Sequence, residues 1–327
     1  MNKHPEYIFN REIKAILEDF RDHLKRQHLD TNTIHQKCNY AGYFLSWTVS
    51  EHLLPEEVRY NDLLSFIDYC KLEDKPRQTI NSMLRSVRNY YEFLKLSHPS
   101  LINPAASLYL KGTRKTVVSN IIAFEHLEEL YRIYPNTSLR EKRNKIILSL
   151  LIYQGVDTGE LGRLEVEHIK LREGKIYIPG GHKSNHRTLE LKPFQLRELQ
   201  KYVTYIRKQI LSQIASPKPA RKPEMIHKEK IESQLFISIN GSENIKNSLL
   251  HLFRDVRRKY PEIKNAGQIR QSVIIHWLKT MNLRQVQYMA GHKYVSSTER
   301  YKMNNLVNLQ NKLEKLHPLG KIGYHKL

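Results

Sequence analysis

The chain has 327 residues, with 54 Lys or Arg against 33 Asp or Glu, so its formal net charge is +21. A hydrophobic fraction of 40% argues against a wholly disordered chain, and no apolar run reaches the roughly 18 residues of a membrane span. Two cysteines, Cys38 and Cys70, are too few for a disulfide framework or a cysteine-based zinc site, so we expect a soluble, cytoplasmic protein without membrane contact.

The first hundred residues carry apolar side chains at helical spacing and predict four helices, at about residues 13–24, 31–47, 63–70 and 76–96. Short connections between them predict a compact helical domain over residues 1–109. The fourth helix has a basic stripe within an arc of about 80°, which is either a DNA contact or an ordinary solvated face. The stripe consists of Arg77, Arg85, Arg88 and Lys95.

A basic, aperiodic stretch at residues 110–120 predicts a linker to a second domain over residues 121–327. Residues 1–110 hold 14 basic and 14 acidic side chains, so the second domain carries the whole excess charge and favours nucleic acid as the partner. Side chains that alternate like those of a strand predict strands at 175–179 and 187–191, joined as a β-hairpin. Three prolines and many charges over residues 212–233 predict a flexible insertion. The predicted helices of this domain are at 124–134, 142–154, 247–260, 268–279, 283–290 and 298–316.

Three positions near the C-terminus have a spacing that points to chemistry. Arg270 lies on one predicted helix, Gly291 and His292 end the next, and Tyr301 follows nine residues after the histidine. Ser296 to Glu299 has the form of a capping box, which predicts a helix start there and places Tyr301 in its second turn. Singly, each residue has a structural explanation, as a helix cap, a packed ring or a solvated charge.

Together these residues resemble the tyrosine recombinase (phage integrase) family, whose pattern is H-x-x-R, then L-G-H, then a tyrosine nine residues after that histidine. RQTINSMLRSVRNYYEFL and the later NPA resemble the family's helical core-binding domain, and KIYIPGGHKSNHRTLEL resembles its catalytic hairpin, with Lys183 at the turn. The resemblance implies a mainly α fold with a small β-hairpin or sheet. It comprises a SAM-like helical core-binding domain and an α+β catalytic domain.

The resemblance also implies a site-specific recombinase of a mobile element, which cleaves and rejoins double-stranded DNA through a covalent 3′-phosphotyrosine. Tyr301 is the nucleophile, Arg270 and His292 hold the phosphate, and Lys183 donates a proton to the leaving 5′-oxygen. No metal or other cofactor is expected. The family assembles as a tetramer on two DNA sites, and the predicted helix containing Leu306 to Leu316 packs either on a neighbouring protomer or on its own domain.

Two family positions differ in this chain. The family pattern T-G-x-R-x-x-E-L aligns with VDTGEL so that Asp157 takes the place of the first arginine, and Gly267 replaces the histidine of H-x-x-R. Arg163 lies about 240° around the helix from Asp157, a poor position for substitution. We therefore expect Arg187, with His182 and His186 beside it, to supply the missing charge at the phosphate.

Two alternatives remain open from the sequence. One is a DNA-binding protein that keeps this fold and its basic surface but has impaired catalysis or none. The other is a topoisomerase with the same nucleophile, which is less favoured because no module beyond the recombinase-like ones is present.

Overall fold

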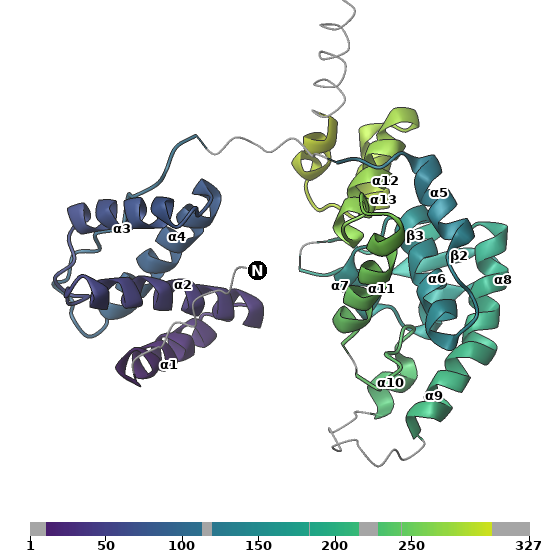
Figure 1. The fold of residues 1–327 in the computed structure, drawn as a ribbon, viewed down its shortest axis with the longest axis horizontal. Helices are drawn as coiled ribbons and strands as arrows, with labels where there is room; N and C mark the ends of the chain where they lie inside the picture. The colour runs from purple at the N-terminus through teal and green to yellow at the C-terminus, as the bar shows by residue number, and fades with distance from the viewer. Residues whose placement is uncertain (1–10, 113–119, 183, 216–227, 243, 303–327) are drawn as a thin grey trace, which may run out of the picture. The chain divides into compact units, whose positions relative to one another are not determined.

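The computed structural model describes residues 11–112, 120–182, 184–215, 228–242 and 244–302. The chain divides after Lys115 into unit 1, residues 1–115, and unit 2, residues 116–327 (Figure 1). This division falls inside the predicted linker of residues 110–120. The described part of the chain is mainly helical with one three-stranded antiparallel sheet, which confirms the predicted fold class.

The described residues of unit 1 form four helices, as predicted from the spacing of the apolar residues: α1 (Arg11–Arg26), α2 (Thr31–Ser50), α3 (Tyr60–Leu72) and α4 (Arg77–Leu94). Its core combines aliphatic side chains with a group of aromatic rings, among which Phe20, Phe44, Phe66 and Tyr91 are fully buried. The rings of Phe44 and Phe66 meet edge to face, with centroids 5.4 Å apart, a favourable arrangement for aromatic pairs.

The predicted basic stripe on α4 is smaller than the sequence indicated. Arg77 and Arg85 are exposed, and Lys95 lies 3.7 Å from Glu92. Arg88 is half-buried, and its guanidinium donates to the carbonyl oxygens of Ala105 and Leu108 at 3.0 and 3.1 Å, so that it anchors the segment after α4. Arg88 therefore has a structural role, and its assignment to a free DNA-binding stripe needs correction.

Unit 2 surrounds a central helix, α6 (Leu139–Tyr153), which contacts α5 (Phe124–Ile133), α8 (Pro193–Lys201) and α12 (Ala266–Thr280). Both faces of α6 contribute to the core, as expected from its continuous apolar run. Further α-helices of unit 2 are α7 (Thr158–Arg163), α9 (Arg207–Ala215), α10 (Lys228–Ser233), α11 (Lys246–Lys259) and α13 (Leu283–Ala290). A π-helical turn (Tyr202–Ile206) joins α8 to α9, and two 3-10 turns lie at Val166–His168 and Leu171–Glu173.

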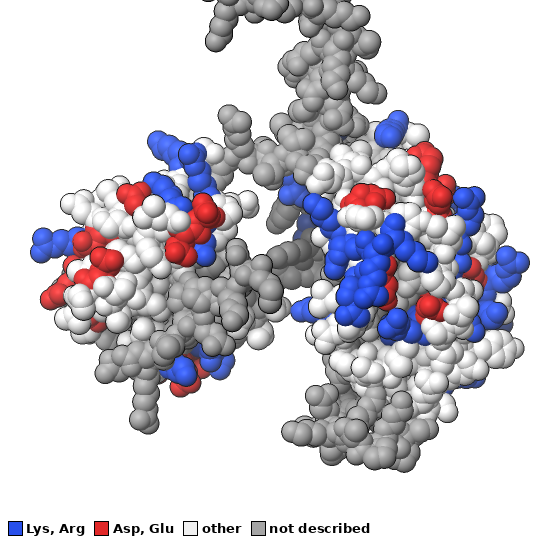
Figure 2. Space-filling model, in the orientation of Figure 1, with Lys and Arg blue, Asp and Glu red and all other residues white. Residues whose placement is uncertain are grey.

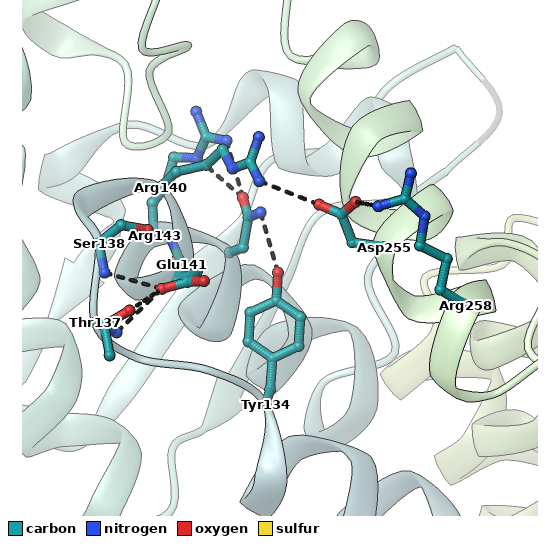
Figure 3. A network of polar contacts seen from close by, with 9 residues as sticks. Tyr134, Thr137, Ser138, Arg140, Glu141, Arg143, Asp255 and Arg258 are labelled. Carbon is teal, nitrogen blue, oxygen red and sulfur yellow. Dashed lines mark hydrogen bonds and ion pairs between the residues drawn. The ribbon is translucent and has the colours of Figure 1, made fainter.

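A polar network attaches the start of α6 to α11 (Figure 3). Ser138 and Glu141 form a capping box, and Arg140 reaches Asp255 of α11 at 3.3 Å. Arg143, buried one turn further along α6, donates to its neighbour Asn144 and to the carbonyl oxygen of Ile237 at 2.8 Å. These bonds hold the core helix in place while satisfying the polar groups that it buries.

The predicted hairpin is present as β2 (Lys175–Ile178) and β3 (Arg187–Glu190), with β1 (Ile169–Lys170) pairing on the other edge of β2. Residues 216–227 of the predicted insertion lie outside the described residues, whereas the ends of the insertion that are described lie in α9 and α10. In the described ranges, no helix combines the length and apolar character that a membrane crossing requires.

Candidate active site

The end of α13 and the helix after it form the first part of the site. Gly291 ends α13 with a left-handed backbone, φ +67°, and turns the chain toward His292. The next helical residues begin at Val295, so the helix starts earlier than the predicted cap at Ser296, but Tyr301 still lies in its second turn. Tyr301 is 4% exposed, and its hydroxyl accepts from Arg300 Nη2 at 3.4 Å.

His292 lies directly beside Tyr301. The two rings are parallel within 4°, with centroids 6.0 Å apart, and His292 Nδ1 is 2.8 Å from the hydroxyl oxygen of buried Thr298. Burial, together with the nearby charges of Arg270, Arg187 and Arg300, lowers the pKa of His292 to about 4. His292 is therefore neutral at pH 7, and in the tautomer in which Nδ1 accepts a hydrogen bond from the Thr298 hydroxyl, Nε2 carries the proton and is a hydrogen-bond donor.

Arg270 joins three segments that are distant in sequence. Its Nη1 donates to the carbonyl oxygen of Gly155 and lies 3.3 Å from Glu160 Oε2, and its Nη2 donates to the carbonyl oxygen of Ala290 at 2.5 Å. The side chain is 12% exposed. Because Ala290 immediately precedes Gly291 and His292, these bonds bring the guanidinium of α12 to the same place as the histidine and Tyr301.

Behind Arg270 lies a second, completely buried ion pair. Arg187 binds Glu160 through both arms of its guanidinium, at 2.6 and 3.0 Å, and neither side chain is exposed. Burial alone would raise the pKa of Glu160, but the hydrogen bonds and charge of Arg187, followed by the charge of Arg270, outweigh it and lower the pKa. Glu160 is thus a buried carboxylate shared by two arginines.

Asp157, at the position of the expected arginine, caps α7. Its carboxylate accepts from the backbone N–H of Glu160 at 2.7 Å, and its own N–H donates to Glu160 Oε2 at 2.8 Å. A carboxylate is favourable here because it satisfies an unpaired N–H and meets the positive end of the helix dipole. The local role of Asp157 is therefore clear, and it puts no positive charge at the site.

Arg187 does not occupy the place predicted for it. The prediction that it faces the phosphate needs correction, because its side chain is enclosed and both arms of its fork bind Glu160. The sequence held a signal for this burial, because alternate residues of a strand lie on the same face and Arg187 alternates with the apolar Leu189. Both side chains are buried in β3. His182 and His186 of the hairpin are exposed.

The hairpin turn is attached to the His292 segment. Gly181 pairs with Ser184, Ser184 pairs with His292, and the Asn185 N–H donates to the Gly291 carbonyl oxygen at 2.8 Å. Lys183, the predicted proton donor, lies within this turn but outside the described residues. Gly267 lies exposed in the first turn of α12, so that position contributes no side chain to the site.

Lys and Arg side chains outnumber Asp and Glu on the surface of unit 2 that Figure 2 shows and gather on the face where α7, α11 and α13 lie in Figure 1. These helices carry exposed cations, among them Arg163, Arg257 and Arg284. Within the described ranges, the one group with metal-ligand spacing is Glu165, Glu167 and His168. It shares no residue with the site, and His168 Nδ1 already accepts from the Glu165 N–H.

Known proteins match most of the chain. The sequence profile of the Phage integrase family matches residues 120–306. Tyrosine recombinase XerC of Staphylococcus epidermidis is 21% identical over 86% of this chain and 89% of its own length. Tyrosine recombinase XerD of Oceanobacillus iheyensis is 24% identical over 80% and 84% of the two chains.

Solved structures show the same fold. The XerH site-specific recombinase bound to its difH substrate superposes with a TM-score of 0.62 at 14% identity, covering 94% of this chain and 91% of that one. The Tn1549 transposon integrase in complex with transposon right end DNA superposes with a TM-score of 0.60 at 12% identity, covering 91% and 99%.

Proposed function

This chain belongs to the phage integrase family, and we propose that it is a site-specific DNA recombinase that cleaves and rejoins strands through a 3′-phosphotyrosine at Tyr301. One observation carries the proposal. Arg270 from α12, His292 from the turn after α13 and Tyr301 from the helical segment after that turn converge, with Arg270 bound to the residue before Gly291 and the His292 ring parallel to that of Tyr301. The relatives include recombinases and integrases in complex with DNA.

The chemistry assigned to these residues needs no external energy. The Tyr301 oxygen attacks the scissile phosphorus as its proton passes to water, a P–O bond forms to tyrosine, and the bond to the 5′-oxygen breaks, so that the phosphodiester energy is kept for rejoining. Arg270 and neutral His292 donate to the non-bridging oxygens as negative charge grows. Lys183 protonates the departing 5′-oxygen, and the reverse attack of a 5′-hydroxyl reseals the strand.

The DNA contacts follow from the charge of both units. The basic face of unit 2 binds the phosphates of the duplex, and Arg77 and Arg85 of α4 extend the contact in unit 1. We propose that four copies assemble on two double-stranded sites, as the family does. The predicted helix of Leu306 to Leu316, which would pack either on a neighbouring protomer or on its own domain, lies outside the described residues.

A second candidate is a DNA-binding protein of this fold that does not cleave. It is favoured by Asp157 in place of an arginine, by the exposed Gly267, and by the small exposed area of Tyr301. Both candidates predict a basic DNA-binding surface, so DNA binding alone does not distinguish them.

The experiment is a search for a covalent adduct. The full chain first selects its site from a random duplex library, and the selected duplex is then nicked at successive positions and incubated with the protein. The recombinase predicts a denaturant-resistant protein–DNA adduct that Tyr301→Phe abolishes and Tyr294→Phe, at a 72% exposed tyrosine nearby, retains. Specific binding without an adduct at any nick position would establish the non-cleaving protein instead.

A further inference from the structure

The charges already placed at the site do not suit a phosphate. Arg187 and Arg270 bring two guanidinium groups, and Glu160 and Asp157 bring two carboxylates, one shared by both arginines and the other at the N-terminus of α7. Asp157 is close enough to Arg270 to interact with it electrostatically. The formal charges of these four groups therefore sum to zero around an entering phosphodiester. The transition state of cleavage carries additional negative charge, which these four groups leave without a net positive partner.

An uncommitted cation lies next to this set. Arg163 is the last residue of α7, and its guanidinium rests against two glycines: a Cβ on Gly181 would lie 2.9 Å from its Nη2, and a Cβ on Gly159 would lie 3.3 Å from its Nη1. The same Cβ on Gly159 would lie 3.2 Å from Asp157 Oδ1. The guanidinium is thus beside the Asp157 end of α7, although the two residues point in different directions on the helix.

The hairpin turn connects Arg163 to the site. Gly181, against which the guanidinium lies, pairs with Ser184, and Ser184 pairs with His292. Two antiparallel bridges of about 5 Å each place Gly181 within about 10 Å of His292. Arg163 therefore flanks the turn that contains Lys183, and the other side of this turn is attached to the His292 backbone.

Arg163 is also free to bind. It is exposed, and within the described ranges no hydrogen bond or ion pair is made by its guanidinium, in contrast to Arg187 and Arg270. The glycines at 159 and 181 place no side chain over it. A guanidinium fork matches two phosphate oxygens and keeps its charge at any physiological pH.

We infer that Arg163 replaces the arginine that Asp157 does not provide, and binds the same phosphate as Arg270. The inference rests on the proposed function for the identity of that phosphate. Asp157 is then compatible with cleavage, because it caps α7 while Arg163, the last residue of the same short helix, supplies the cation. Arg163 would contact the reacting phosphate directly.

The test is a methylphosphonate scan of the selected duplex, in which each duplex has one uncharged phosphate analogue. Wild-type protein is compared with Arg163→Ala and with Arg172→Ala, which removes another exposed cation, located before β2 at the end of that strand away from the turn. At one position the analogue should weaken wild-type and Arg172→Ala binding about tenfold more than it weakens Arg163→Ala binding, as expected for the loss of one charged hydrogen-bonded contact. Arg270→Lys should change the response at the same position.

The adduct assay separates this inference from the proposed function. If wild type forms an adduct, Arg163→Ala should form it about a hundredfold more slowly, and the position at which its response to the analogue is reduced must be the cleaved phosphate. Equal rates, identical scans, or a position other than the cleaved one would each overturn the inference while the recombinase stands. If no adduct forms, the recombinase proposal fails, and the inference stands or falls on whether Arg163 and Arg270 sense the same phosphate.

Discussion

Gly291 should be one of the most sensitive positions of unit 2, because two separate constraints exclude a side chain there. Its φ of +67° costs an alanine about 1 kcal/mol. An added Cβ would also overlap Arg187 Nη1 and lie 3.0 Å from the Asn185 carbonyl oxygen. Arg187 cannot retreat without leaving Glu160, and breaking a buried pair costs about 3–5 kcal/mol. We expect Gly291→Ala to lower the free energy of unfolding by about 4 kcal/mol or more.

The chain offers both a probe and a matched control. It has two tryptophans, buried Trp47 in unit 1 and buried Trp277 in unit 2, so urea unfolding of a Trp47→Phe protein followed by fluorescence reports unit 2 alone. Gly174 has the same backbone angles as Gly291, φ 67° and ψ 26°, but a Cβ there would meet only Leu196 Cδ1 at 3.8 Å. Gly174→Ala therefore measures the backbone cost without the clash.

The difference in unfolding free energy between the two glycine variants measures the cost of disturbing the buried Arg187–Glu160 pair. Gly291→Ala should lose about 3 kcal/mol more than Gly174→Ala, and this excess should largely vanish when both are made in an Arg187→Met background, where the clash is relieved. If the two glycine variants are equally stable, or if the excess persists without Arg187, then Arg187 is not held against Gly291 as described.

Three further expected outcomes concern Arg187, His292 and Arg88. Arg187→Ala should cost about 3–5 kcal/mol of unit 2 stability in the same urea assay, because it leaves Glu160 buried without its main partner; a loss below about 1 kcal/mol would contradict the buried pair. The pKa of His292 is about 4 in the folded protein and 6.5 in the unfolded chain, so unfolding at a pH between 4 and 6.5 takes up a proton. The free energy of unfolding of unit 2 should therefore decrease as the pH falls from 6.5 to 4. His292→Gln should flatten that dependence, and an unchanged slope would refute the lowered pKa. Arg88→Ala should lower the free energy of unfolding of unit 1 by about 2 kcal/mol, measured by the fluorescence of Trp47, because it removes two hydrogen bonds to the segment after α4. Arg85→Ala should instead weaken DNA binding and leave the stability of unit 1 unchanged. The reverse pattern would show that Arg88 belongs to the DNA-binding stripe.

Much of the fold was predictable because its signals are local. Apolar residues at helical spacing predicted α1 to α4, and strict alternation predicted β2 and β3, since both periods are properties of a few consecutive residues. The relation of Gly291, His292 and Tyr301 was equally local, because all three lie within eleven residues and a glycine in the left-handed conformation commonly ends a helix.

The charged side chains were harder to place, because their partners are distant in sequence. Arg187 and Glu160 are 27 residues apart, and Arg270 and Glu160 are 110 apart, so no local pattern shows that one carboxylate holds both arginines. Arg88 was assigned to a free surface for the same reason, since its acceptors lie 17 and 20 residues away.

The sequence by itself determined the two-part helical organisation, the hairpin, the excess charge beyond residue 110, and the spacing of Arg270, His292 and Tyr301. Only the tertiary structure decided which arginines are available to an anion. It enclosed Arg187, left Arg163 exposed at the hairpin turn, and used Asp157 as a helix cap. The physical reason is that a charge is costly to bury unless a partner meets it, and only the folded chain determines which partner that is.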